Sequence, residues 1–253
     1  MCSKNLGRIV LLVLVLSGVG QARGQAAGLR PVKENGKWGY ADRSGHMVIT
    51  PRFDEAGEFA DGLAKVGVVD VKLPAVVGKP NVRWGYIDES GRDVVALRYY
   101  VLRDFAEGLA AAAVLDAGEV EAMVPGRGRR ANLRWGYVDR QGREVIAPRF
   151  FEAGDFSEGL AAVDVGGVDG SACGRPHKFG YVDLTGVLRI EPRFAVAVSF
   201  RGGRARVGVG EQTYVGRCLC CAPKFLGIYG YVNREGEFTP DAPADGADPR
   251  DNP

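Results

Sequence analysis

The sequence predicts an all-β protein built from tandem hairpin repeats. The 17-residue stretch "KWGYADRSGHMVITPRF", which starts at Lys37, recurs with changes at Arg83, Arg134 and Lys178, and its first half recurs at Ile228. Apolar and polar residues alternate within these repeats, and no window has a sustained helical period. Because one such hairpin cannot bury its own aromatic residues, we expect four full units and a half to stack as an open solenoid-like array or, alternatively, to close as a five-bladed β-propeller.

The N-terminal residues 1–26 have the features of a secretory signal peptide. Lys4 and Arg8 precede the apolar run from Ile9 to Leu16, and small residues follow at spacings typical of cleavage sites. The run is shorter than the roughly 20 apolar residues of an ordinary membrane-spanning helix. We therefore expect a cleaved, secreted or periplasmic protein with no stable membrane insertion, and an uncleaved anchor is the alternative.

The charge of the chain is nearly balanced once this segment is set aside. Residues 1–26 hold three of the 33 basic residues and none of the 31 acidic ones, which leaves 30 basic against 31 acidic and a net charge of −1. No global field then draws the protein to nucleic acid or anionic lipid, so we expect no nucleic-acid partner. An electrostatic partner requires a local patch.

Each repeat is a fixed block of 29 residues followed by an insert of variable length. The leading aromatic residues are separated by 46, 51, 44 and 50 residues, and they are Trp38, Trp84, Trp135, Phe179 and Tyr229. The blocks end at Val66, Ala112, Val163 and Val207, so that inserts of 17, 22, 15 and 21 residues absorb all the variation. Length variation confined to one loop position is typical of repeat arrays.

Inside the block, the order of residues is that of a hairpin followed by a third strand. Trp38 and Tyr40 share one face of a strand, and Gly39 between them leaves room for a neighbouring backbone. A D-x-x-G turn follows from Asp42, and the proline of the return strand suits an edge or a bulge. A short crossing with Phe59 then leads to a third strand, and a fourth is possible where inserts continue the strand pattern. We expect this repeat domain to span 27–238, with a disordered tail over 239–253.

These features together resemble a known family. The pattern WGY(V/I)D-x-x-G-x-x-VI-x-PRF, followed by A-x-x-F-x-EGLA-x-V, is similar to the WG repeat of bacterial proteins over roughly Lys37 to Phe238. The resemblance implies an all-β repeat, often exported, in proteins of mostly unassigned function, and it brings no catalytic residues. The fourth unit departs from the pattern, with Phe179 for Trp and "RGGRARV" from Arg201, and the fifth stops after its hairpin.

Signatures of catalysis and cofactor binding are nearly absent from the sequence. Beyond residue 26 there are two histidines, His46 and His177, and no nucleophile elbow or P-loop spacing. The stretch "GRGRRA" at Gly126 lacks the strand-then-helix context of a dinucleotide site. We expect a protein that is not an enzyme and that has no catalytic, cofactor-binding or metal-binding residues.

The cysteines gather in two adjacent inserts. Apart from Cys2 in the expected signal peptide, they are Cys173, Cys218, Cys220 and Cys221. An even number of cysteines in neighbouring loops of an exported protein predicts two disulfides, whose connectivity stays open. A metal site that includes His177 is the alternative, although C-x-C-C poorly matches the usual spacing of structural zinc ligands.

The aromatic residues allow two interpretations. The leading tryptophans sit at a fixed offset from turn and core positions, which favours packing over a sugar-stacking platform. Tyr100 and Phe151 fall off the inward pattern and are better candidates for exposed aromatic residues. Neither the tryptophans nor Tyr100 and Phe151 define a glycan site.

A repeated arginine gives the most specific candidate site. It lies fourteen residues after each leading aromatic, at Arg52, Arg98, Arg149 and Arg193. Acids follow six and nine positions later in the first three units, which predicts repeated surface ion pairs; they are Glu58 and Asp61, Asp104 and Glu107, and Asp155 and Glu158. The fourth unit has Ser199 and Gly202 there and adds three arginines, so we expect an uncompensated basic patch of Arg193, Arg201, Arg204 and Arg206. This patch is either an anion-binding site or a solvated face.

The sequence therefore favours an exported, non-catalytic protein-interaction scaffold at the bacterial envelope. The alternative is a module that binds a cell-wall or envelope glycan or polyanion. The partner, an unknown protein or envelope polymer, cannot be identified from the residues.

Overall fold

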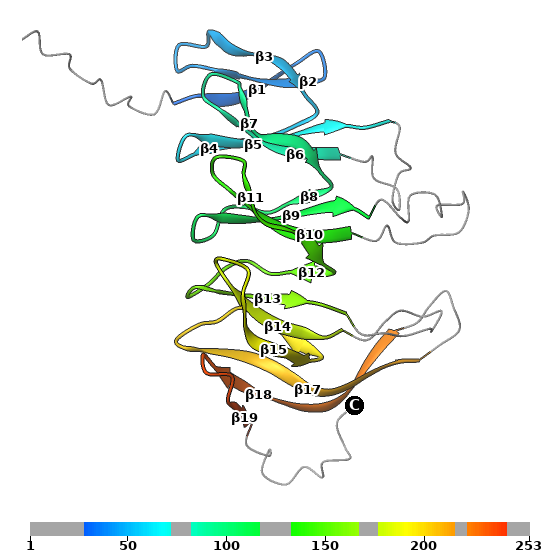
Figure 1. The fold of residues 1–253 in the computed structure, drawn as a ribbon. Helices are drawn as coiled ribbons and strands as arrows, with labels where there is room; N and C mark the ends of the chain where they lie inside the picture. The colour runs from blue at the N-terminus through cyan, green and yellow to red at the C-terminus, as the bar shows by residue number, and fades with distance from the viewer. Residues whose placement is uncertain (1–27, 72–81, 117–132, 167–176, 216–221, 242–253) are drawn as a thin grey trace, which may run out of the picture.

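The computed structural model describes residues 28–71, 82–116, 133–166, 177–215 and 222–241, with side chains described outside 212–224. The expected signal peptide, all four cysteines of the inserts and most of the expected tail lie outside the described residues. Within them, every regular element is a β-strand (Figure 1). The all-β prediction is confirmed.

The strands form five antiparallel sheets that follow one another along a stack (Figure 1). The first sheet is β1-β2-β3, and the second to fifth are β4-β5-β6-β7, β11-β10-β9-β8, β12-β13-β14-β15 and β16-β17-β18-β19. The bounds are β1 Arg30–Glu34, β2 Lys37–Ala41, β3 Met47–Phe53, β4 Glu55–Ala60, β5 Leu63–Val69, β6 Val82–Asp88, β7 Asp93–Tyr99, β8 Val101–Leu102, β9 Leu109–Leu115, β10 Leu133–Asp139, β11 Glu144–Phe150, β12 Glu152–Ala153, β13 Leu160–Asp164, β14 Phe179–Asp183, β15 Leu188–Phe194, β16 Val196–Ala197, β17 Arg204–Val215, β18 Ala222–Asn233 and β19 Phe238–Pro240.

The stack is open at both ends. β1, which could have completed the last unit of a propeller, pairs instead with β2 through the two-residue turn Asn35-Gly36. Both turn residues have positive φ, 49° and 81°, as a type I′ hairpin requires. The first and fifth sheets lie at opposite ends of the molecule, so the open array is confirmed and the alternative propeller is wrong (Figure 1).

The fourth strand of each complete sheet comes from the crossing, and the inserts do not supply it. The short strands β8, β12 and β16 are parts of the crossing, and each pairs with the strand that follows it. The inserts connect the two central strands of a sheet, as between β5 and β6. In the fifth sheet, β19 extends to Pro240, past the expected end of the repeat domain at 238.

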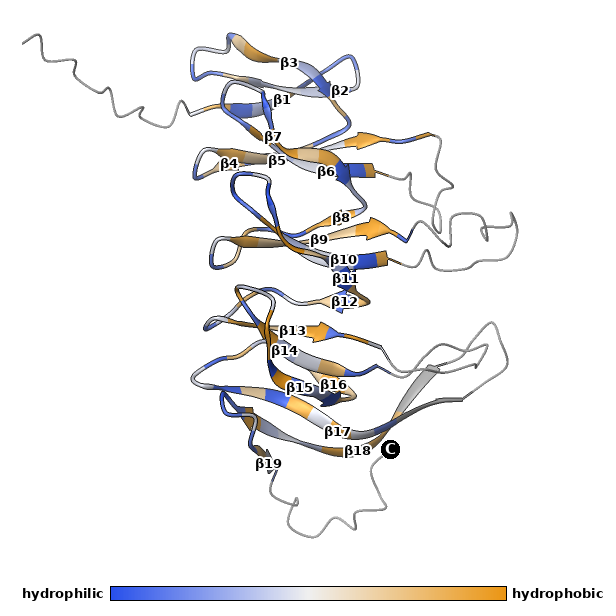
Figure 2. Ribbon diagram, in the orientation of Figure 1, coloured by the Kyte–Doolittle hydropathy of each residue, from blue (hydrophilic) through white to orange (hydrophobic). Residues whose placement is uncertain are grey.

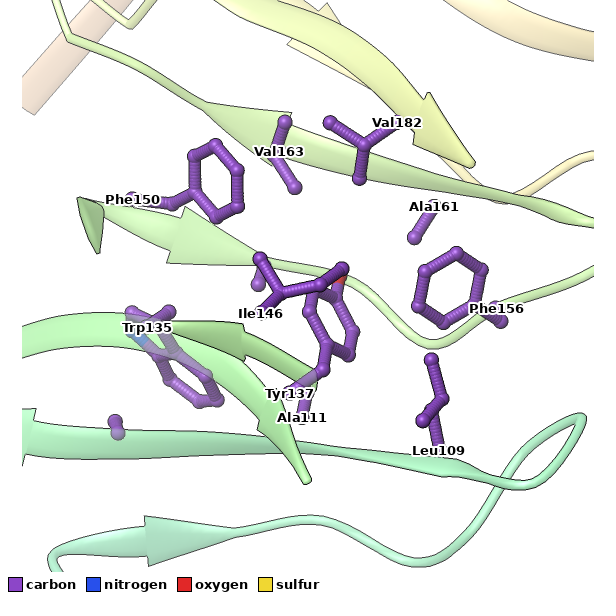
Figure 3. Packing of buried hydrophobic residues seen from close by; sticks show 12 residues of the cluster. Leu109, Ala111, Trp135, Tyr137, Ile146, Phe150, Phe156, Ala161, Val163 and Val182 are labelled. Carbon is purple, nitrogen blue, oxygen red and sulfur yellow. The ribbon is translucent and has the colours of Figure 1, made fainter. Parts of the chain in front are cut away.

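A sequence block does not correspond to a sheet; it corresponds to the layer between two sheets. The block from Trp38 to Val66 places Tyr40 and Phe53 in the first sheet but Ala64 and Val66 in the second, and all four are buried in one cluster. Each of four such clusters lies between consecutive sheets, and Figure 3 shows one in which Tyr137, Ile146 and Phe156 pack together. Five sheets therefore need four complete blocks and one half.

The glycine of the aromatic-Gly-Tyr triplet is explained by a close backbone approach. A Cβ on Gly39 would lie 2.3 Å from the carbonyl oxygen of Ile49 and 2.7 Å from the nitrogen of Pro51. The return strand β3 has a register shift between its pairs with Trp38 and Tyr40, which brings its backbone over the glycine. The proline therefore lies on an edge strand beside a bulge, as the sequence predicts.

Candidate binding face at the C-terminal end of the stack

The repeated arginine joins consecutive sheets. Arg149 donates to the carbonyl oxygen of Gly186 at 2.8 Å, in the D-x-x-G turn of the next hairpin. Arg52 and Arg193 bond in the same way to Gly91 and Gly236. Each guanidinium also lies over the ring of the following residue, at 4.9 Å for Arg149. The repeated arginine thus fastens one sheet to the next.

The predicted ion pairs between this arginine and the acids of its own crossing are wrong. The crossing belongs to the next sheet. Its acids therefore interact with other residues and do not pair with the arginine of their own block. Asp104 pairs with Lys65 of β5 at 2.7 Å. Glu107 accepts from the backbone nitrogen of Gly159, in the turn of the following sheet, at 2.8 Å.

The acid nine positions after the arginine occupies a two-residue turn before the third strand of each block. Asp61, Glu107 and Glu158 have φ of 49°, 51° and 55° and precede a glycine, as in type I′ turns. Glu158 accepts from the backbone nitrogens of Gly202 and Gly203 at 2.5 and 2.8 Å. The side chains of Glu107 and Glu158 therefore each cap the turn of the next sheet.

The fourth unit lacks these acids at the point where the stack ends. Gly202 takes the turn position with φ of 62°, and among the described residues no further sheet follows whose turn would need a carboxylate. Ser199 replaces the other acid and donates from its hydroxyl to the carbonyl of Asp155 at 3.4 Å. The loss of the two acids in the fourth unit therefore coincides with the last sheet of the stack.

The outward face of the fifth sheet, here called the end face, carries arginines where the inner sheets carry packing residues. Arg204 pairs with Asn233 across the strand, a position held in inner sheets by buried Leu63, Leu109 and Leu160. Arg206 pairs with Tyr231, a position held in the third and fourth sheets by buried Ala111 and Ala162. Figure 2 shows the alternation of hydrophilic and hydrophobic segments along β17.

Tyr231, whose counterparts in the complete blocks are buried, is only half-buried on the end face. In each complete block the tyrosine of the triplet contacts the phenylalanine of the next crossing, with ring centres 4.7 to 4.9 Å apart. Its hydroxyl donates to a carbonyl of that crossing, as from Tyr181 to Val198 at 2.8 Å, and burial raises the pKa of Tyr181. Up to residue 241, where the described part of the chain ends, no crossing follows Tyr231. It is covered instead by Arg204, whose guanidinium lies 4.5 Å from the ring centre.

Three of the four predicted arginines come together on this face. Arg201, Arg204 and Arg206 line one hollow of about 580 Å³ with Tyr231. A second hollow, of about 340 Å³, lies beside it between Arg206 and Tyr229. Neither Arg201 nor Arg204 has an acidic partner among the residues that the structure describes. These two guanidinium groups are available to an anion.

The other two members of the predicted patch are partly compensated. Arg193 does not line either hollow, because its guanidinium bonds to the Gly236 carbonyl and lies 5.2 Å from the centre of the Phe194 ring. Arg206 pairs with Asp241 at 3.1 Å. We therefore define the candidate site as Arg201, Arg204 and Arg206 with Tyr229 and Tyr231.

The two tyrosines and Asp241 were not predicted as site residues. Both positions are packing positions in the sequence pattern. The position of Tyr231 is a buried tyrosine in every complete block, whereas the position of Tyr229 is a leading aromatic that is buried at Trp135 and half-buried at Trp38, Trp84 and Phe179. The signal that could have found them is the incomplete fifth unit, because a hairpin without a following crossing leaves its inward tyrosine without a partner.

The aromatic residues considered for glycan stacking have covered ring faces. Trp135 is 8% exposed and has the Arg103 guanidinium 5.3 Å from its ring centre. Phe151 carries Arg134 at 3.8 Å, and Tyr100 carries Arg83 at 5.9 Å. Packing of Trp135 is confirmed, and Tyr100 and Phe151 are half-buried, each with a guanidinium near its ring.

The remaining candidates of the sequence add no second site. His177 lies with its ring nitrogen 2.8 Å from the carboxylate of Asp164, and hydrogen bonds from His177 and from the Lys178 backbone overcome the effect of burial and lower the pKa of that carboxyl. Over the described parts of the chain, no three His, Cys, Asp or Glu side chains are grouped to hold a metal ion. No helix of the described residues is long and apolar enough to span a membrane.

A family comparison agrees with the repeats seen in the structure. The model of the WG containing repeat matches residues 38–68, 84–114, 135–168 and 179–211. The matches together cover just over half of the chain, so the protein belongs to the WG containing repeat family. No curated protein matches the chain. The family and the stacked fold define a binding or scaffold module.

Proposed function

We propose that the protein is an exported, non-catalytic scaffold of the bacterial envelope that binds an acidic protein through its end face. The observation that carries the proposal is the change of chemistry on the last sheet. The position of Arg204 holds leucine in the second to fourth sheets, and the position of Arg206 holds alanine in the third and fourth and Lys65 in the second. At the end of the stack both positions hold arginine, over two half-buried tyrosines.

The chemistry of the end face supports a partner that is both acidic and apolar. Guanidinium groups bind carboxylates through paired hydrogen bonds. Of the three arginines close together, only Arg206 has an acid beside it in the described part of the chain, so an anion would relieve the repulsion among them. Tyrosine and arginine are also the residues that dominate the energetics of protein interfaces. Export is supported by the pattern of residues 1–26, which places a basic segment before an apolar run.

A second candidate function is binding of a polyanionic envelope polymer. It is favoured by the three arginines of the larger hollow, because guanidinium groups bind phosphate as well as carboxylate. A polymer without apolar groups would use the arginines but would leave Tyr229 and Tyr231 without a role.

The test is a titration of the exported protein with poly-L-glutamate and with polyphosphate, at low and at physiological salt. We expect binding that weakens with salt, since exposed charges are screened beyond about 8 Å at physiological ionic strength. The variant Ser199→Asp/Gly202→Glu places two acids beside the arginines and should abolish binding. Glu fits at position 202, because Glu107 and Glu158 adopt the same turn conformation.

The matched control adds the same charge elsewhere. Val48→Asp/Val145→Glu changes two exposed side chains on β3 and β11 and should leave binding intact. The proposal fails if the parent binds neither polymer, or if the end-face variant binds as well as the parent. Mass spectrometry of the exported protein tests the leader, with a new N-terminus near residue 27 as the expected result and an intact Met1 as the contrary one.

A further inference from the structure

We infer that the end face is an unfinished inter-sheet interface that accepts an extended protein segment with an aromatic residue directly after an acidic one. This inference rests on the proposed function, because it names the kind of partner that the same face binds. It follows from the four complete interfaces inside the chain, which show what normally covers this face.

Each complete interface is closed by the crossing of the next sheet. Phe105 lies against Tyr86, with ring centres 4.8 Å apart, and packs on the cluster that contains Leu63. Asp104, the residue before it, pairs with Lys65 at 2.7 Å. All four crossings deliver a ring to the tyrosine of the preceding sheet, and this one also delivers a carboxylate to a basic residue of that sheet.

The end face presents the receiving half of this arrangement. Tyr231 corresponds to Tyr86, and Arg206 corresponds to Lys65, because each pair lies opposite in the same register of its sheet. Arg204 corresponds to Leu63 and lines the larger hollow together with Arg206 and Tyr231. A ring stacked beside Tyr231 and an acid at Arg206 would repeat the contacts of the interface between the second and third sheets.

One of the two contacts, an acid at Arg206, already forms within the chain. Asp241 follows β19 and pairs with Arg206 at 3.1 Å, while its backbone nitrogen donates to the Tyr229 carbonyl at 2.9 Å. An acid therefore occupies the basic position, but no aromatic ring of the described residues lies against Tyr231. Asp241 acts as a weak internal competitor for the acid of the partner.

The partner is a segment of another protein, because a second end face does not fit. Two copies placed end face to end face would bring arginines against arginines, which like charges disfavour. A polyanion without rings satisfies only the arginines. An acidic-aromatic segment satisfies both the charge and the tyrosines.

The probe is a synthetic peptide of the chain's own first crossing, "DEAGEFADGLA" from residues 54–64, which holds Glu58 and Phe59 in the required order. Binding to the full exported chain is measured by calorimetry against the same peptide with Phe59→Ala, which keeps every charge. We expect the alanine peptide to bind about tenfold more weakly, because it loses one aromatic pair and its burial. Tyr231→Ala in the protein should remove this difference.

Two further variants test the acid. Arg206→Ala should weaken binding of the parent peptide, whereas Asp241→Asn should strengthen it by freeing the guanidinium. Arg143→Ala, which removes an exposed arginine paired with Asp139 in the third sheet, is the control and should change nothing.

The outcomes separate this inference from the proposed function. Equal affinity of the two peptides, with poly-L-glutamate still bound, overturns the inference and leaves an anion-binding end face. Absence of binding to both peptides and to both polymers overturns the inference and the proposed function together.

Discussion

Replacement of Gly136 by alanine tests the reason for the aromatic-Gly-Tyr triplet. A Cβ at this position would lie 2.3 Å from the carbonyl oxygen of Ile146, 2.7 Å from the nitrogen of Pro148 and 2.8 Å from the carbonyl carbon of Ala147. All three atoms are backbone atoms of the return strand, so no side-chain rotation relieves the clash. Overpacking of a core costs about 1 to 3 kcal/mol, and we expect the upper end of that range here.

The assay is thermal and chemical denaturation of the exported protein. For a domain of this size, a loss of about 3 kcal/mol lowers the melting temperature by about 6 to 12 °C. Gly154→Ala is the matched control, because its Cβ would meet the nearest atom, the Ala162 carbonyl oxygen, at an ordinary 3.5 Å. Equal melting temperatures for the two variants would show that the close approach does not explain the glycine.

Two other predictions concern stability. Trp135→Ala should cost about 3 to 5 kcal/mol, because the ring is 8% exposed in the cluster between the third and fourth sheets; an unchanged denaturation midpoint would contradict core packing. Acid should destabilise the fold partly through Asp183. Burial tends to raise the pKa of this carboxyl, but hydrogen bonds from the Thr185 hydroxyl, from the backbone and from Arg189 lower it to about 2. The unfolded chain then binds the proton more tightly than the folded one, so this stabilisation is present above the unfolded pKa of about 3.9 and is lost as the pH falls toward 2. Asp183→Asn should flatten the unfolding free energy over that interval, since Asn233 shows that Asn can form the same turn; an unchanged pH profile would refute this assignment.

Much of the fold could be predicted because its determinants are local. The D-x-x-G turn, for example, is specified by residues next to one another: the Asp42 carboxylate accepts from the backbone nitrogens of Ser44 and His46 at 2.9 Å. The same turn recurs at every hairpin, so the repeats could be aligned and the strands placed from the sequence. The stacking followed from the need of each hairpin for a neighbour, whereas the choice between an open stack and a closed propeller required the pairing of β1 with β2.

The partners of the charged residues could not be predicted, because they depend on how consecutive units are placed. Sequence spacing put Arg149 beside the acids of its own crossing, but the crossing belongs to the next sheet and the arginine bonds to the Gly186 carbonyl. The loss of Glu at position 202 was visible in the sequence as a change of charge. Its cause, the end of a stack, became visible only with the sheet order.

The end face was therefore predicted in part. Clustering of Arg204 and Arg206 could be expected from their spacing, since residues two apart share a face of a strand. Arg201 joins them because it lies opposite Arg204 across the turn. The exposure of Tyr231 could not, because the same residue type is fully buried at Tyr40 and Tyr181. Among the described residues, Tyr40 and Tyr181 are each followed by a crossing that covers them, and Tyr231 is not.

Amide hydrogen exchange with bound peptide tests the central claim most directly, since it locates the partner on the stack. With saturating "DEAGEFADGLA", exchange should slow in 196–207 and 229–233, which carry the end face, and should stay unchanged in β1 and β2 at the other end. Protection at β1 and β2, or equal protection along the whole stack, would contradict the assignment of the binding face.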